Sequence, residues 1–214
     1  MQPQFNQVEF PLKNSSYLPD GKAGKTARIF STLFVPPTLT LFSFSFLGLQ
    51  FEPSLDKTML VIGSAFLFTF FLPIVFFVVM LRKKKIINQD AEMKEERTIP
   101  FLFGLSLLLI GYFLLRSYHI QPLTLAFWFC YVSNTAAIIL INKIWKISIH
   151  ALGIAVPLAM FLFIGSWIAY PLAFLLFLVG WSRINLKCHT FAQVIAGAFF
   201  GFLSAYLQLY LFLK

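Results

Sequence analysis

Long hydrophobic runs separated by short polar segments make up most of this sequence. A helix needs about 20 apolar residues to cross the roughly 30 Å hydrocarbon core of a bilayer. The second run is the clearest, because it is uninterrupted and ends on the basic segment "RKKK". We expect one transmembrane helix in each of seven runs: Ile29–Phe51, Met59–Leu81, Pro100–Leu115, Pro122–Ile141, Ile149–Gly165, Ile168–Trp181 and Thr190–Leu213.

The fifth and sixth runs could also be read as one segment, because Ile147 to Trp181 contains no charge apart from a possible proton on His150. Those 35 residues would form a helix of about 52 Å, far longer than one bilayer core. We therefore predict two short helices with a turn near the "GSW" and "YP" segments.

Composition supports a membrane protein. Hydrophobic residues make up 59% of the 214 residues and charged residues only 12%, which excludes an ordinary soluble domain. The prediction is an all-α integral membrane protein: a polar N-terminal tail over 1–28, and a bundle of about seven transmembrane helices over 29–214. The tail has no apolar stretch of the signal-peptide type.

Alternating the seven spans across the bilayer places most basic residues on one side. This side carries the tail, "RKKK", Lys94, Arg97, Lys143, Lys146, Arg183 and Lys187, whereas Lys57, Arg116 and Lys214 fall opposite. The positive-inside rule makes the crowded side cytoplasmic, in the plasma membrane or inner membrane of a cell. The net charge of +9 is explained by topology and anionic lipid, so no nucleic-acid partner is expected.

Small and sulfur-containing residues are expected to serve packing. Cys130 and Cys188 lack metal or redox spacing. Gly197 and Gly201, in "GAFFG", form a small-xxx-small pattern that lets the last helix approach a neighbour closely.

Two histidines indicate chemistry at the crowded side. His150 and His189 each begin an apolar helix, and a serine precedes each closely. A helix N-terminus favours a bound anion and a neutral imidazole, which can act as nucleophile or base. Arg183, Arg97 and Lys94 add the cations that a phosphate monoester requires. His119 falls on the opposite side and is left out of the site.

These residues carry a family resemblance over roughly residues 90 to 205, within a core of about 82–214. "SRINLKCHTFAQ" resembles the third signature of the type 2 phosphatidic acid phosphatase superfamily, to which the vanadium haloperoxidases belong: Ser182, Arg183 and His189 match it in spacing. "KISIHALG" is similar to the second signature through Ser148 and His150.

The sequence also departs from the family pattern. "DAEMKEERTIP" retains Arg97 of the first signature, but Asp90 stands at its lysine position, and Lys94 is the candidate replacement. Gln193 occupies the position of the aspartate that orients the nucleophilic histidine. An amide can hold the imidazole tautomer, but it stabilises a developing imidazolium less than a carboxylate does.

The resemblance implies a membrane lipid phosphatase that needs no metal or other cofactor. His189 would attack phosphorus to form a phosphohistidine, His150 would give a proton to the leaving oxygen, and Gln193 would orient His189. The implied phosphate-binding residues are Arg183, Arg97, Lys94, Ser148, Ser182 and Lys187. The implied substrate is a lipid phosphate or diphosphate.

Other interpretations remain open at this point. The basic residues also suit interfacial anchors, and the serines suit helix caps. A protein that keeps the fold but has lost catalysis would bind lipid phosphates without hydrolysing them. A small transporter would need polar residues deep in the spans, where only Ser133, Asn134, Thr135 and Gln208 are prominent.

The topology can be tested by cysteine accessibility. A cysteine at Ser16 should be labelled only from the cytoplasm, and one at Asp56 only from outside the cell, because the loops alternate between the two sides. Labelling of the Ser16 position alone from outside intact cells would contradict the proposed orientation.

Overall fold

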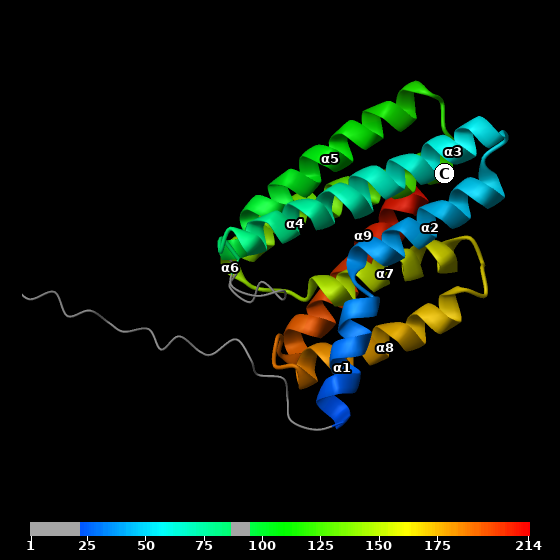
Figure 1. Cartoon of the computed structure of the whole chain (residues 1–214). Helices are drawn as coiled ribbons and strands as arrows, with labels where there is room; N and C mark the ends of the chain where they lie inside the picture. The colour runs from blue at the N-terminus through cyan, green and yellow to red at the C-terminus, as the bar shows by residue number, and fades with distance from the viewer. Residues whose placement is uncertain (1–21, 87–94) are drawn as a thin grey trace, which may run out of the picture.

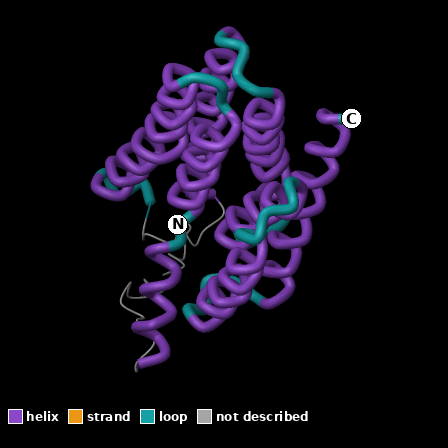
Figure 2. The backbone as a smooth tube through the Cα atoms, turned by 90° about the vertical axis from the view of Figure 1, so that its right-hand side faces the viewer, coloured by secondary structure: helices purple, strands orange, loops and turns teal. Residues whose placement is uncertain are grey.

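The fold is a bundle of helices, and the structure, a computed structural model, describes residues 22–86 and 95–214 (Figure 1). Within these ranges the chain is helical with short connections and has no strand (Figure 2). In chain order the elements are α1 (Lys22–Leu33), α2 (Pro36–Phe51), α3 (Leu55–Ser64), the π-helical segment η1 (Ala65–Phe71), α4 (Leu72–Arg82), the short turn η2 (Glu95–Arg97), α5 (Thr98–Ser117), α6 (Pro122–Ile144), α7 (Ile149–Phe163), α8 (Ala169–Asn185) and α9 (Phe191–Leu213).

The all-helical prediction is confirmed, and each expected apolar run contains helix. In the described residues, four helices are long and apolar enough to cross a membrane: Leu55–Arg82, α5, α6 and α9. A fifth is added if α1 and α2, bent by 45° at their junction, form one span. The remaining two, α7 and α8, are about 22 and 26 Å long, shorter than the roughly 30 Å core. The chain is thus a multi-pass membrane protein, with four or five candidate spans among its described residues.

The start of the first helix differs from the expectation, whereas the turn between the fifth and sixth runs agrees with it. Helix α1 begins at Lys22, so the last seven residues of the expected 1–28 tail are helical. Ala27 is fully buried there, which explains why this polar-looking segment is ordered. Between α7 and α8 the chain turns at Gly165, which has a φ of +68°. The expected turn near "GSW" is therefore confirmed.

The helices of the bundle begin and end at two opposite ends of the molecule (Figure 1). One end gathers the end of α4, the start of α5, the end of α6, the start of α7, the end of α8 and the start of α9. All the described residues of the three signatures belong to this end, which we call the signature end. The other end carries Lys57, whose Nζ donates to the carbonyl of His119 over 2.5 Å.

Helix α7 is the buried centre of the bundle, with ten of its 15 residues buried. The neighbouring α9 approaches it through glycines. A Cβ at Gly197 would collide with the carbonyl oxygen of Ser148, and one at Gly201 would lie 2.9 Å from the Leu152 side chain. The predicted close packing of "GAFFG" is confirmed, with α7 as the partner.

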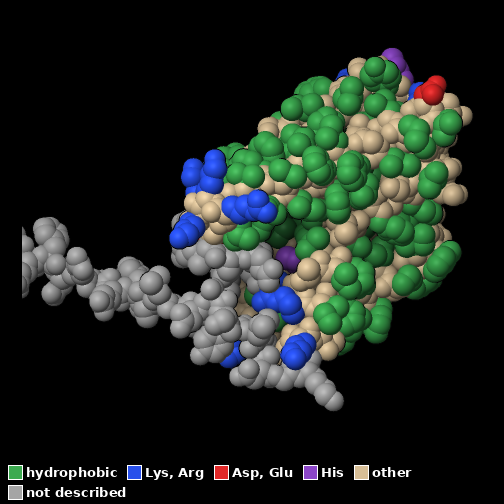
Figure 3. Space-filling view, in the orientation of Figure 1, with side chains coloured by type: hydrophobic (Ala, Val, Ile, Leu, Met, Phe, Trp, Pro, Cys, Tyr) green, Lys and Arg blue, Asp and Glu red, His purple; other side chains and the backbone are tan. Residues whose placement is uncertain are grey.

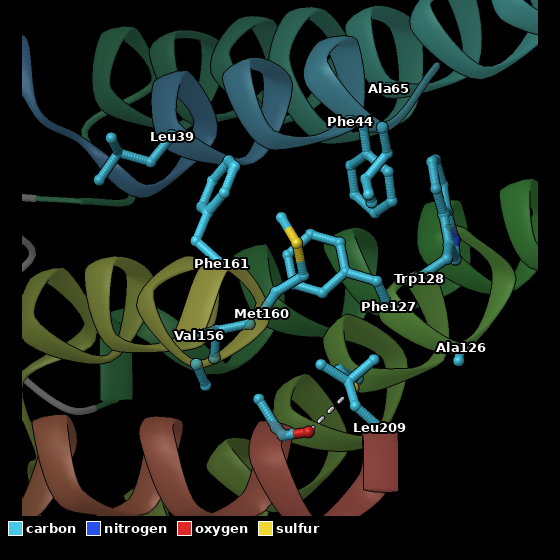
Figure 4. Packing of buried hydrophobic residues seen from close by; sticks show 14 of the residues in the cluster. Leu39, Phe44, Ala65, Ala126, Phe127, Trp128, Val156, Met160, Phe161 and Leu209 are labelled. Carbon is cyan, nitrogen blue, oxygen red and sulfur yellow. Dashed lines mark hydrogen bonds between the residues drawn. The ribbon is translucent and has the colours of Figure 1, made fainter. Parts of the chain in front are cut away.

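Aromatic side chains fill the centre between α2, α6 and α7 (Figure 4). The ring of Phe44 lies 4.7 Å from that of Trp128 and 5.1 Å from that of Phe127, measured between centroids. The Trp128 indole donates to the carbonyl of Leu108 over 2.8 Å, which ties α6 to α5. Cys130 and Cys188 are buried and free, as expected of packing residues.

Polar side chains in the spans pair between α6 and α9. Ser133 donates to Gln208 Oε1 over 2.6 Å, and Ser204 donates to Asn134 Oδ1 over 2.5 Å. Hydrogen bonds of this kind hold transmembrane helices together. Three of the four residues that could have indicated a transport path therefore have a structural explanation.

The glycine contact gives a stability prediction. Gly197→Ala should lower the free energy of unfolding by about 1–3 kcal/mol, because the added methyl meets backbone that cannot rotate away. Unfolding of the purified protein in mixed micelles measures the change.

The matched control is Gly63→Ala in α3, where a Cβ meets no described atom within 4 Å. This substitution should be neutral or stabilising, because alanine is the better helix former. Equal stability of the two variants would contradict the close α7–α9 contact.

Candidate functional site

The third signature forms the end of α8, a tight loop and the start of α9. The amides of Cys188 and His189 both donate to the carbonyl of Arg183, over 3.1 and 3.2 Å, which closes the loop. Thr190 then caps α9: its hydroxyl accepts from the amide of Gln193, and the Gln193 side chain accepts from the amide of Thr190. This capping box fixes His189 immediately before the first turn of α9.

Gln193 also determines the tautomer of His189. Its Oε1 lies 3.1 Å from His189 Nδ1 and 3.1 Å from the Thr190 amide nitrogen. An amide N–H can only donate, so the Gln193 atom between these two groups is the oxygen. The Nδ1 atom of His189 must then carry the proton, and Nε2 keeps its lone pair. The expectation that Gln193 orients His189 agrees with this geometry.

Burial and nearby cations keep His189 uncharged. Its side chain is 6% exposed. Burial first, and then the charges of Arg97, Arg183 and Lys146, lower the pKa of His189 from 6.5 to about 3, against a smaller opposing effect of Gln193. A neutral imidazole with a free Nε2 is the form that can act as a nucleophile.

The second signature is bound directly to the third. The amide of Ser148 donates to the Gln193 carbonyl over 3.0 Å, and the Ser148 hydroxyl caps α7 by accepting from the amide of Ala151 over 3.4 Å. His150 is the second residue of α7. The same residue, Gln193, therefore touches His189 through its side chain and the second signature through its backbone.

The first signature is represented by Arg97. This arginine lies in the turn before α5 and is 5% exposed. Its charge is among those that lower the pKa of His189, so it lies near that imidazole. Asp90 and Lys94 lie outside the described residues.

A single cavity of about 380 Å³ joins the three signatures. Arg97, His150 and His189 all line it, although Arg97 and His189 are 92 residues apart in the sequence. Apart from these three, its walls are mainly apolar and come from α2, η1, α4, α5, α6 and α7. In the space-filling view the surface is hollowed between α4 and α2, and a histidine side chain is visible beside basic residues (Figure 3).

Two further predicted residues, Arg183 and Ser182, lie behind the cavity. The Arg183 side chain is 1% exposed, and its Nη1 donates to the Ser31 hydroxyl over 2.6 Å. Ser182 donates to the carbonyl of Ala27, also over 2.6 Å. Both bonds attach α1 to α8. Within the described chain, neither residue contributes to the cavity lining, although the charge of Arg183 acts on His189.

The remaining predicted residues are not at the cavity wall. Lys187 is exposed, with a φ of +55° in the loop, and does not line the cavity as the described residues define it. Ser148 is fully buried, at the cap of α7.

Lys146 is a site residue that the sequence did not indicate. Its Nζ donates to the carbonyl of Cys188 over 3.0 Å, and its charge acts on His189. It lies four residues before His150, which is the one signal that could have identified it. Lys146 thus brings a cation from the α6–α7 connection to the loop that carries His189.

Metal binding finds no support among the described residues, where no group of three His, Cys, Asp or Glu side chains has metal-site geometry. No family model, curated protein or solved structure matches the chain. The geometry of the site therefore carries the functional argument.

The electrostatics of His189 can be measured by NMR of protein with ¹⁵N-labelled histidine. Across neutral pH the His189 signal should show a neutral imidazole protonated at Nδ1. Lys146→Gln should raise the pKa of His189, because a nearby positive charge is removed. Lys57→Gln, at the opposite end, is the control that should leave the pKa unchanged.

The lowered pKa of His189 also makes the stability of the folded protein depend on pH. As pH falls from 6.5 towards 3, the unfolded chain takes up a proton at His189 that the folded protein excludes, so stability decreases. His189→Gln, which also serves to assign the signal, should remove this part of the pH dependence. A His189 signal that titrates near 6.5 would contradict the buried cationic site.

Proposed function

We propose that this protein is a membrane phosphatase that hydrolyses a lipid phosphate or diphosphate monoester through a phosphohistidine intermediate. The observation that carries the proposal is the shared cavity of Arg97, His150 and His189. It is supported by the hydrogen bond from His189 Nδ1 to Gln193, which leaves Nε2 free for attack.

The first step transfers the phosphoryl group to His189. The Nε2 lone pair attacks phosphorus, the P–O bond to the lipid breaks, and His150, which starts protonated beside the bound phosphate anion, gives its proton to the departing oxygen. The phosphorylated imidazole of His189 retains its Nδ1 proton, and Gln193 accepts that hydrogen bond.

The second step releases phosphate. His150 takes a proton from water, the resulting hydroxide attacks phosphorus, and the N–P bond breaks. Both histidines then have their starting protonation. Arg97, Arg183 and Lys146 supply positive charge for the phosphoryl oxygens as negative charge develops on them.

We further propose that all seven apolar segments cross the bilayer, with α7 and α8 as short spans, and that the signature end faces the cytoplasm. The basic residues at the ends of α4, α6 and α8 support this orientation. The site then lies at the interface, where a phosphate meets the cations while its hydrocarbon chain remains among apolar side chains.

A catalytically decayed lipid-phosphate-binding protein is the second candidate. It is favoured by the amide of Gln193 in place of a carboxylate, and by the bond from Arg183 to Ser31 behind the cavity. Such a protein would keep the cationic site and bind the same ligands without turnover.

Phosphate release from a panel of lipid phosphates and diphosphates tests the proposal. The parent should release phosphate, and His189→Ala should abolish the release. Gln193→Glu should raise the rate about fivefold, because a hydrogen bond to a charged partner contributes about 1 kcal/mol more than one between neutral groups. Glutamate is chosen over aspartate because it places its carboxylate where Gln193 Oε1 lies.

Controls separate the two candidates. His119→Ala, at the opposite end, should retain parental turnover. Gain of activity only in Gln193→Glu would identify a decayed enzyme. Binding of lipid phosphates without hydrolysis by the parent or Gln193→Glu would favour the binding protein and contradict the phosphatase.

A further inference from the structure

The cavity extends far beyond the two histidines. On α5 its lining runs from Arg97 through Pro100, Phe101 and Gly104 to Leu108. Arg97 and Leu108 are eleven residues apart, which corresponds to roughly 16 Å along a helix. The space therefore has a cationic end at the signature end of the bundle and an apolar interior.

Two of the hydroxyl groups in the cavity wall bond within their own helices. Thr40 donates to the carbonyl of Pro36 over 2.9 Å, and Thr69 donates to the carbonyl of Ala65 over 2.7 Å. Tyr131 and Thr135 are the other hydroxyl-bearing residues of the described lining. The rest of the wall beyond the histidines is apolar and is suited to hydrocarbon.

The π-helical segment η1 forms one side of this wall. Pro73, just after it, has no amide hydrogen and cannot donate the usual helical hydrogen bond. The wider π-helical turns of η1 lie directly before this proline. Phe68, Thr69 and Pro73 all line the cavity. The irregular turn therefore contributes directly to the shape of the space.

The length of the cavity lining limits the chain that it can take. An extended chain advances about 1.2 Å per bond, so roughly 16 Å corresponds to about 13 carbons at most. Part of this length belongs to the cationic end, where the phosphate binds. The cavity volume of about 380 Å³ is sufficient for one such chain.

Gly104 lies part of the way along this space. A Cβ built on it meets no described atom within 4 Å. At Gly111, about two helical turns further along α5, a Cβ would instead collide with Trp128. A side chain at position 104 would project into open volume. The absence of one leaves room for the inner half of a bound chain.

We propose that this cavity is a chain-binding subsite for one hydrocarbon chain of at most about 13 carbons, and that Gly104 determines the chain length it accepts. The inference rests on the proposed function, because the phosphate of the same lipid occupies the cationic end. Gly104 is a specificity-determining position and has no part in the chemistry.

Binding of alkylphosphonates, single-chain analogues whose C–P bond is not cleaved, tests the proposal. A short chain of about 8 carbons and a long chain of about 12 are compared at equal mole fraction in the same micelles. Transfer from the micelle to the cavity then moves either chain between two apolar surroundings. The parent should bind both with similar affinity, at one phosphonate per protein. In Gly104→Leu the long chain should bind roughly tenfold more weakly than the short one, because leucine fills the space.

Gly63→Leu is the matched control, since its Cβ also meets no described atom and Gly63 does not line the cavity. It should keep the parental ratio. Normal binding of the short chain shows that Gly104→Leu is folded. If Gly104→Leu binds neither chain, Gly104→Ala is measured instead, and its ratio of long-chain to short-chain affinity should fall by a smaller factor. A parental ratio in the Gly104 variant would overturn the inference.

The readout does not depend on catalysis. If Gly104→Leu changes the ratio of long-chain to short-chain affinity but the parent releases no phosphate, the chain subsite is supported and the proposed phosphatase activity is contradicted. Phosphate release with an unchanged ratio would retain the phosphatase and reject the chain subsite.

Discussion

The contact between the start of α7 and the start of α9 is the constraint on which the site depends. Gly197 has no side chain, so the Ser148 backbone can approach it, and the Ser148 amide bonds to the Gln193 carbonyl. This contact brings together the helix starts that carry His150 and His189. A bulkier residue at Gly197 would separate both the helices and the two histidines.

Gln193 combines structural and chemical roles. Its side-chain oxygen completes the cap of α9 and accepts the Nδ1 proton of His189, while its carbonyl receives the Ser148 amide. A carboxylate could perform the two side-chain roles and add charge. The amide of Gln193 carries no charge, so it does not offset the positive charges around the His189 imidazole. The low pKa of His189 agrees with this arrangement.

The N-terminal helix adds a constraint from outside the three signatures. Ser31 holds Arg183 and Ala27 holds Ser182, so α1 fixes the end of α8 from behind. The bend at the Val35–Pro36 junction then directs α2 along the cavity, where Pro36 also packs on Gly153. The same short region thus supports both the cationic site and the apolar wall.

The sequence by itself determined the helical class, the approximate positions of the apolar helices except α1, and the common end of the signature residues, because apolar run length and charge placement are local properties. It did not determine which side chains reach the cavity. Arg183 and His189 are six residues apart, yet one bonds to α1 and the other lines the cavity. Lys146 lies at the site, and Gly104 faces open space, only because helices distant in the sequence pack in this arrangement. Side-chain direction and the volume between helices are products of tertiary packing, which no local pattern records.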